Sequence, residues 1–364
     1  MRLLAFRKRL LSIQNKRREQ LRPKKGVTLR DIAEELGISA VTVSNALAGK
    51  KGVSEEKREQ ILECALRRGL DLAKYRQRTT SNKEASEELK EGASIGVMVL
   101  NRYISVGTSF YWEMYQKTAY VASGLKCLTS LIIWKSDSEE SAIPPQIANQ
   151  EIDGLILIGP MDDGYKRRLK KAFDGPIVLL DQPIFDDDVS CVLSGDYYGM
   201  YRSARELIRA GHREIGFVGS LDYSKNIIDR YYGYKKCMRE NGLSVRKEWV
   251  LPDRYGKEER GLVVLPDTLP TAFVTSSDWA ASYLYDALQE RGLSVPEDIS
   301  IASYDDYLYN HPLAGRLTTY HVDMEHMARC AVRLVIRGLI GPGSTGVICE
   351  VDSHMVLRDS IRKI

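Results

Sequence analysis

Residues 27–47 read VTLRDIAEELGISAVTVSNAL, and the pattern of this stretch decides the fold of the first part of the chain. Gly37 is a residue type that ends helices, and Ser39 is one that caps the start of the next helix. The apolar residues on both sides of Gly37 recur at helical spacing. They are Ile32, Ala33, Leu36, Val41, Val43, Ala46 and Leu47. The stretch therefore predicts a helix-turn-helix, and a third helix over 54–68 would close its small core with Ile61, Leu62 and Ala65.

A helix-turn-helix places its first helix across the DNA backbone and the start of its second helix in the major groove. We therefore expect DNA contacts from Thr28, Leu29, Ser39, Ala40, Val41, Thr42, Ser44, Asn45 and Ser54. Asn45 suits adenine, and Ala40 and Val41 suit thymine methyl groups, so the half-site is expected to be biased toward A·T pairs. An ordinary helical hairpin is the alternative interpretation of the same spacing.

The matches in this region extend beyond a generic helix-turn-helix. The pattern V-T-L-x-D-I-A-x-x-x-G-[IV]-S-x-x-T-V-S-x-x-L, followed by V-S-x-x-x-R, resembles the N-terminal domain of the lactose-repressor (LacI/GalR) family of bacterial transcription regulators. The matching residues are Val27, Thr28, Leu29, Asp31, Ile32, Ala33, Gly37, Ser39, Thr42, Val43, Ser44, Leu47, Val53, Ser54 and Arg58. The resemblance implies a homodimer that binds operator DNA in the cytoplasm.

Composition agrees with a globular protein of two or three domains. The chain has 364 residues, 43% hydrophobic and 28% charged, with a net charge of +4. Residues 1–26 form a basic extension, with Glu19 as its one acid, which suits either phosphate contact or simple solvation. The family starts at about Val27, so the resemblance assigns this extension no role. Arg7, Lys8 and Arg9 interrupt any secretory signal, and no run is long enough to span a bilayer.

Residues 71–93 are polar and charged, which predicts a linker between a DNA-binding domain over 27–70 and a larger domain over 94–364. In the family this linker begins with Tyr-x-Pro-Asn and forms a hinge helix that inserts a leucine into the minor groove. Leu72 and Ala73 replace the proline and asparagine, and Thr79 falls near the place of the leucine. A polar threonine is a poor wedge between base pairs, so these departures argue against that mechanism.

From residue 94 onward, short apolar runs alternate with amphipathic helices, which predicts a doubly wound parallel sheet. The expected strands are 95–100, 128–134, 154–159, 177–180, 215–219, 272–274 and 299–302, and the expected helices include 111–123, 200–210, 231–241 and 279–291. Two such units meeting after about Asp181 would enclose a ligand cleft at the carboxyl ends of their strands. The resemblance also covers this part and implies an α/β, two-lobed, periplasmic-binding-protein-like domain.

The resemblance also implies where a small effector binds. Arg230 matches the arginine of the family's R-x-x-G-aromatic motif and Asp305 the aspartate of its late [GS]-[FY]-D-D motif, and both hold the effector in relatives. A guanidinium and a carboxylate suit neighbouring sugar hydroxyls. Ser277 replaces an asparagine that is common in relatives, and Trp279, Phe110 and Tyr111 fall near pocket positions. Pairing of Arg230 and Asp305 with surface neighbours, and a core role for the aromatic residues, are the alternatives.

The sequence carries no sign of a metal site, a cofactor or catalysis. The six cysteines have no paired spacing and are interpreted as small apolar residues in a reducing cytoplasm. His321 and His326 fit no metal motif, and no nucleophile elbow or Walker motif is present. We therefore expect a non-enzymatic, homodimeric repressor whose operator affinity is set by a carbohydrate effector. A sugar-binding protein without a DNA role, an enzyme, and a regulator controlled by a protein partner instead of an effector are the alternatives.

Overall fold

The structure is a computed structural model, and it divides the chain into two compact units, residues 1–88 and 89–364. The described residues are 29–47, 57, 60, 61, 64, 92–104, 109–135, 137–138, 141–183, 186–254, 261–341 and 346–364. The basic extension, Thr28, Ser54 and all but the last two residues of the expected linker lie outside these ranges. The two units are described separately below.

The first unit contains the predicted helix-turn-helix. Helix α2 (Leu29–Leu36) ends at Gly37, which adopts the left-handed region with φ +61°. Helix α3 (Ala40–Leu47) starts after Ser39, whose Oγ accepts a 3.0 Å hydrogen bond from the backbone N–H of Thr42. A small core joins these helices to residues of the expected third helix. Its buried members are Ile32, Ala33, Val43, Ala46, Leu47, Ile61 and Cys64.

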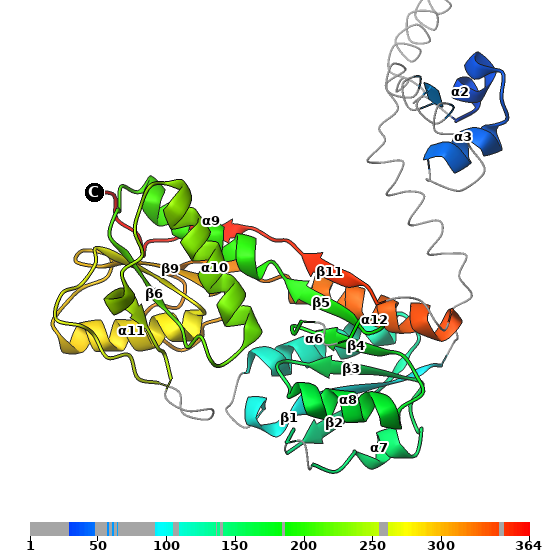
Figure 1. Cartoon of the computed structure of the whole chain (residues 1–364), viewed down its shortest axis with the longest axis horizontal. Coiled ribbons are helices and arrows are strands. Elements are labelled where there is room, and N and C mark those ends of the chain that lie inside the picture. Colours follow the sequence, from blue (N-terminus) through cyan, green and yellow to red (C-terminus); the bar gives the residue numbers. More distant parts are fainter. Residues whose placement is uncertain are drawn as a thin grey trace, which may run out of the picture. The chain divides into compact units, whose positions relative to one another are not determined.

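The second unit contains two lobes, each built on a six-stranded sheet (Figure 1). We call lobe 1 the part built on the fully parallel sheet with strand order β11-β5-β4-β3-β1-β2. Its strands are β1 (Ser94–Leu100), β2 (Leu128–Trp134), β3 (Gly154–Ile158), β4 (Ile177–Leu180), β5 (Ser190–Ser194) and β11 (Ile348–Val351). Its helices are α6 (Phe110–Gly124), α7 (Pro145–Ala148), α8 (Asp163–Ala172) and α12 (Met324–Ile340), and a short 3-10 turn spans Asn101–Tyr103.

Lobe 2 has the strand order β12-β10-β9-β8-β6-β7, and β12 is its one antiparallel strand. Its strands are β6 (Ile215–Val218), β7 (Val250–Leu251), β8 (Ala272–Thr275), β9 (Ser300–Asp305), β10 (Thr318–His321) and β12 (Met355–Val356). Its helices are α9 (Asp196–Arg209), α10 (Lys225–Glu240) and α11 (Asp278–Glu290), with a 3-10 turn over Lys247–Trp249. The expected strands and helices of both lobes are thus present, with ends shifted by a few residues.

The chain passes between the lobes three times. The first passage is at Gly195, between β5 and α9, and the second is at 322–323, between β10 and α12. The third is at 352–354, between β11 and β12. The expected boundary after Asp181 is therefore wrong, because the segment SCVLS (190–194) adds a fifth strand to lobe 1 before the chain leaves it. The serines at both of its ends hide this strand in the sequence.

The parallel strands of both lobes end toward a common cleft, as doubly wound sheets do at a ligand site. Asp181 directly follows β4, residues 276–278 follow β8, and Asp305 is the last residue of β9. Polar side chains at these strand ends are thereby held on buried, rigid elements. Among the described residues, no helix has the length and apolar character needed to cross a membrane.

Candidate effector site

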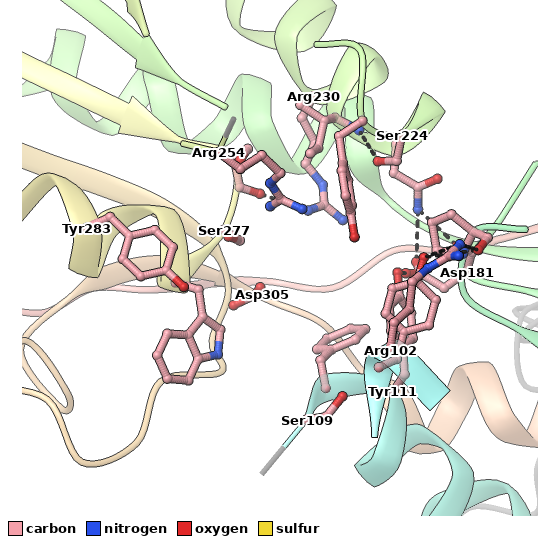
Figure 2. Close-up of a pocket in the computed structure, with 18 residues that line it drawn as sticks. Arg102, Ser109, Tyr111, Asp181, Ser224, Arg230, Arg254, Ser277, Tyr283 and Asp305 are labelled. Carbon is pink, nitrogen blue, oxygen red and sulfur yellow. Dashed lines mark hydrogen bonds between the residues drawn. The ribbon is translucent and has the colours of Figure 1, made fainter. Parts of the chain in front are cut away.

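A cavity of about 350 Å³ lies between the two lobes of the second unit (Figure 2). This volume falls within the range of small-molecule sites. All six residues predicted to hold an effector line it: Phe110, Tyr111, Arg230, Ser277, Trp279 and Asp305. The other lining residues are Arg102, Tyr103, Ser109, Pro160, Asp181, Tyr223, Ser224, Asn226, Ile227, Arg254, Ser276 and Tyr283. Residues as far apart in the chain as Arg102 and Asp305 therefore meet in one cavity.

Arg230 projects from α10 into the cavity and is held from behind by protein partners. Its Nε donates to Asp196 Oδ1 at 2.6 Å, and its Nη1 donates to the carbonyl of Ser276 at 2.8 Å. The guanidinium also lies 3.9 Å above the ring of Tyr304, a cation–π contact. The partners of Arg230 are thus buried groups and not the surface neighbours of the alternative interpretation. Because a guanidinium carries five N–H donors, this arrangement leaves donors for a ligand.

The Arg230–Asp196 pair is almost completely buried, with 7% and 5% of the two residues exposed. Burial disfavours the charge on Arg230, but the carboxylates of Asp196, Asp181 and Asp305 raise its pKa above the ordinary value. Burial also raises the pKa of Asp196, against the opposing attraction of Arg230. The guanidinium therefore stays charged and stationary beside the cavity.

Asp305, at the end of β9, occupies a strained position with φ +103°. Its Oδ1 accepts hydrogen bonds from the backbone N–H of Tyr307 at 3.1 Å and of Asp278 at 3.4 Å. Burial, followed by repulsion from Asp278, raises the pKa of Asp305 well above its ordinary value. A carboxyl group with a raised pKa can donate one hydrogen bond as well as accept others, which suits a ligand hydroxyl.

Ser277 and Trp279 belong to the start of α11. Ser277 is the N-cap of this helix, because its Oγ accepts a 3.1 Å hydrogen bond from the N–H of Ala280. The hydroxyl proton of Ser277 stays available for a ligand. Trp279 and Tyr283 have ring centroids 6.4 Å apart and form an aromatic wall on the lobe 2 side of the cavity. Figure 2 shows Tyr283 in this wall.

Phe110 and Tyr111 supply the facing wall from the start of α6 in lobe 1. Their rings meet edge to face with centroids 5.4 Å apart, and Phe110 also contacts Tyr307 of lobe 2 at 5.6 Å. The Tyr111 hydroxyl donates to Asp181 Oδ2 at 3.0 Å. Aromatic faces on both sides of a polar cavity are the arrangement expected for a sugar, whose rings are apolar on their faces and polar at their edges.

Sequence reasoning missed Asp181 as a site residue, although it follows β4 at the strand end where such residues are expected. Asn226 Nδ2, from lobe 2, donates to both its carbonyl and its Oδ1 at 3.2 Å. Burial and then repulsion from Asp196 raise the pKa of Asp181 to about 7. Asp181 therefore joins the two lobes directly beside the cavity.

Two further arginines were also missed, and each is fixed by an aspartate outside the cavity. Arg102 donates to both oxygens of Asp137, at 2.8 and 3.2 Å. Arg254 donates from Nη2 to Asp253 at 2.7 Å and stacks 3.8 Å from the ring of Tyr223. Arg102 lies in the short 3-10 turn after β1 and Arg254 in an irregular segment after β7, and neither segment has a periodic pattern that would single it out.

Among the residues predicted to contact DNA, Ser39 caps the start of α3. Ser39 Oγ lies 2.9 Å from Thr42 Oγ1, so these two side chains are linked at the start of α3. Leu29 and Ala40 pack partly against the headpiece core, which limits the surface they offer to DNA. Val41, Ser44 and Asn45 lie on α3, but their side chains, like Thr28 and Ser54, are outside the described part.

Within the described residues no group of three or more His, Cys, Asp or Glu side chains has a metal-binding arrangement. The cavity lining consists instead of arginines, carboxyl groups, hydroxyls and aromatic rings. This set suits an organic ligand with several hydroxyl or carbonyl groups.

Comparisons with known proteins assign both units. Residues 28–66 match the family described as bacterial regulatory proteins, lacI family, and residues 204–361 match the periplasmic binding protein-like domain. The chain is 24% identical over 345 residues to the HTH-type transcriptional repressor PurR of Histophilus somni (strain 129Pt), covering 93% of this chain and 99% of that protein.

Solved structures share the fold. A transcriptional regulator CelR–cellobiose complex superposes with a TM-score of 0.63 and 20% sequence identity. A lac repressor dimer bound to operator and the anti-inducer ONPF superposes with a TM-score of 0.59 and 21% sequence identity. Each comparison covers 93% of this chain and 100% of the other. The two family matches, together with the similarity to PurR along nearly the whole chain, show a helix-turn-helix domain of the lacI family of bacterial regulatory proteins joined to a periplasmic-binding-protein-like domain.

Proposed function

We propose that this protein is a transcriptional repressor that binds operator DNA as a homodimer and releases or tightens its grip when a carbohydrate binds between its lobes. One observation supports the proposed ligand binding: Arg230, Asp305 and the two aromatic walls line the same cavity.

The ligand class follows from the same lining and from the relatives. Paired donors on Arg230, a carboxyl group on Asp305 and stacking surfaces at Trp279 and Phe110 match the edges and faces of a sugar ring. The structural neighbour CelR was solved with cellobiose. We assign the same class of ligand, a neutral sugar, to this chain. We expect the sugar to dissociate from the protein without having been chemically altered.

The proposed DNA binding depends on the helix-turn-helix of the first unit, formed by α2 and α3, which we call the headpiece. A single helix-turn-helix makes few base contacts, so two copies are needed for specific binding to a two-fold operator. The lac repressor structure is a dimer on its operator, which is the arrangement we propose here. Binding to a bacterial operator also places the protein in the cytoplasm.

The coupling between ligand and DNA follows from contacts that cross the cleft. Asn226 binds Asp181, Phe110 packs on Tyr307, and Lys225 Nζ lies 3.0 Å from Asp163 Oδ2. A ligand that prefers one arrangement of the lobes shifts the population toward it. The accompanying change in lobe 1 alters the spacing of the two headpieces of the dimer, and with it the operator affinity.

The test combines DNA selection with ligand binding. Full-length protein is used to select a half-site from randomised DNA, and its affinity is then measured by fluorescence anisotropy with and without each sugar of a panel. We expect an A·T-biased half-site and at least one sugar that changes the affinity several-fold. A G·C-dominated core would contradict the base contacts assigned to α3. Loss of the sugar effect in Asp305→Asn, but not in the distant control Gly124→Ala, would place the ligand in the cavity.

A further inference from the structure

All three passages between the lobes come together at one tyrosine side chain. Tyr320 lies on β10, just before the second passage at 322–323, and it is completely buried. A Cβ added to Gly195, in the first passage, would lie only 2.9 Å from the Tyr320 hydroxyl oxygen. At the third passage, this hydroxyl donates to Asp352 Oδ1 at 2.8 Å and accepts from the backbone N–H of Ser353 at 2.5 Å. One hydroxyl group, close to the second passage, therefore lies against both the first and the third.

Arg202 of α9 holds the same part of the third passage. Its Nη1 donates to the carbonyl of Ser353 at 2.7 Å, and its Nη2 donates to Asp352 Oδ2 at 3.0 Å. Its guanidinium also lies 5.9 Å from the centre of the Tyr320 ring. The third passage is thus fixed to a helix and to a strand of lobe 2.

A stack of side chains joins Tyr320 to the cavity. The rings of Tyr320 and Tyr304 are stacked, with centroids 5.2 Å apart and planes at 27°. The ring of Tyr304 lies in turn 3.9 Å from the guanidinium of Arg230, which lines the cavity. Arg230 also donates to Asp196, the residue directly after Gly195. Arg230 is therefore connected to the first passage by a hydrogen bond and to the third by stacked rings.

Helix α9 leaves this stack no free space on one side. A Cβ added to Gly199 would lie 2.7 Å from ring atoms of both Tyr304 and Tyr320. Because protein interiors are close-packed, a ring that moves in such surroundings has to displace its neighbour.

We propose that Tyr320 sets the angle between the lobes and couples that angle to ligand binding at Arg230. A change in the third passage has to move Tyr320, and close packing passes this movement through Tyr304 to Arg230. A ligand bound to Arg230 therefore favours the lobe angle of this structure, and by reciprocity a loosened passage weakens ligand binding. Tyr320 is not among the residues that line the cavity, so it acts as a positioning residue. The coupling to a ligand rests on the proposed function, whereas the control of the lobe angle does not.

The first test measures the lobe angle without any ligand. Spin labels are attached to Glu151→Cys in lobe 1 and Glu290→Cys in lobe 2, two exposed positions of the full-length protein. Cys330 and Cys349 are replaced by serine, since the other four cysteines are buried. An excess of unlabelled protein ensures that double electron–electron resonance records distances within one chain. Tyr320→Phe should raise the ratio of altered to original distances about five-fold, the effect of one lost hydrogen bond on an equilibrium.

Matched variants separate this effect from a general loss of stability. Tyr234 is equally buried in lobe 2, and its hydroxyl donates to the carbonyl of Ile215 at 2.7 Å, away from the three passages. Tyr234→Phe should lower Tm as Tyr320→Phe does but leave the lobe distances unchanged. If Tyr320→Phe does not fold, Arg202→Ala removes two hydrogen bonds to the third passage and should alter the distances in the same way. Its control is Arg209→Ala on the same helix, which removes only an exposed pair within α9.

The second test measures by calorimetry the affinity of each sugar that stabilises the unmodified protein. Binding to Tyr320→Phe should be about five-fold weaker, and binding to Tyr234→Phe should be unchanged. The proposal would be overturned by unchanged lobe distances in Tyr320→Phe, or by equally altered distances in Tyr234→Phe. A sugar that binds Tyr320→Phe as tightly as the unmodified protein would also overturn it. If no sugar binds, the proposed function fails, whereas the lobe distances still decide the role of Tyr320.

Discussion

Replacing Arg230 by methionine should destabilise the protein strongly, beyond any effect on a ligand. The change removes the partner of Asp196, of which only 5% is exposed. Removing one member of a buried ion pair costs about 3–5 kcal/mol, because the remaining charge is left buried. At about 2–4 °C per kcal/mol for a domain of this size, Tm should fall by about 6–20 °C.

The double variant Arg230→Met with Asp196→Leu separates the cost of the orphaned charge from the loss of packing. Replacing both members of a buried pair by apolar residues is often neutral, so the free energy of unfolding should return to within about 2 kcal/mol of that of the unmodified protein. The double variant should nevertheless fail to bind the sugar, because the guanidinium donors are gone.

The pH dependence gives a further check on the single variant. Burial already raises the pKa of Asp196, and without Arg230 its folded-state pKa should rise further. A carboxyl group whose folded-state pKa lies above its unfolded value binds more protons in the folded state, so stability falls as pH rises through that range. The single variant should thus be closest to the unmodified protein in mild acid. Equal Tm values for the single variant and the unmodified protein at pH 7 would refute the reasoning.

Four smaller predictions concern other parts of the chain. Burial raises the pKa of Asp181 to about 7, so its contribution to stability is lost as pH rises from about 4 to 7. Asp181→Asn should therefore show a smaller fall of Tm over this pH range in thermal melts, and an unchanged slope would contradict this. Gly233→Ala should cost about 1–3 kcal/mol in urea melts, since a Cβ there would lie 2.0 Å from the carbonyl oxygen of Tyr197, whereas Gly124→Ala, with open space, should be neutral or stabilising. Ser39→Ala should cost the headpiece about 1 kcal/mol in helix capping, measured as earlier loss of its helical signal, and no loss would refute the cap. Lys225→Ala should change stability by less than about 1 kcal/mol, because its bridge to Asp163 is exposed, yet weaken sugar affinity in calorimetry by opening the cleft.

The parts of the fold that depend on local pattern could be predicted from the sequence. The turn at Gly37 and the cap at Ser39 depend on neighbouring residues, and both are confirmed. The central strands β1, β3 and β4 are nearly continuous apolar runs because both faces of a parallel sheet are covered. Arg230 and Asp305 were found through their motifs, and the structure brings both to the cavity.

What the sequence could not reveal depends on contacts between distant segments. The return of α12 and β11 to lobe 1 depends on packing against α6 and pairing with β5, which no local pattern encodes. Arg254 reaches the cavity from an irregular segment after an edge strand of two residues.

Control of the protein by a sugar in the cleft can be tested with a thermal-shift screen of the full chain against a panel of mono- and disaccharides. Ligand binding to the folded state raises Tm by mass action, by about 2.7 kcal/mol of stability at a hundred-fold excess over Kd. We expect at least one sugar that raises Tm in the unmodified protein and in Gly124→Ala but not in Asp305→Asn. Control by a sugar in the cleft would be contradicted if a sugar stabilised Asp305→Asn equally. It would also be contradicted if no sugar of the panel raised Tm in a protein that still binds its selected operator.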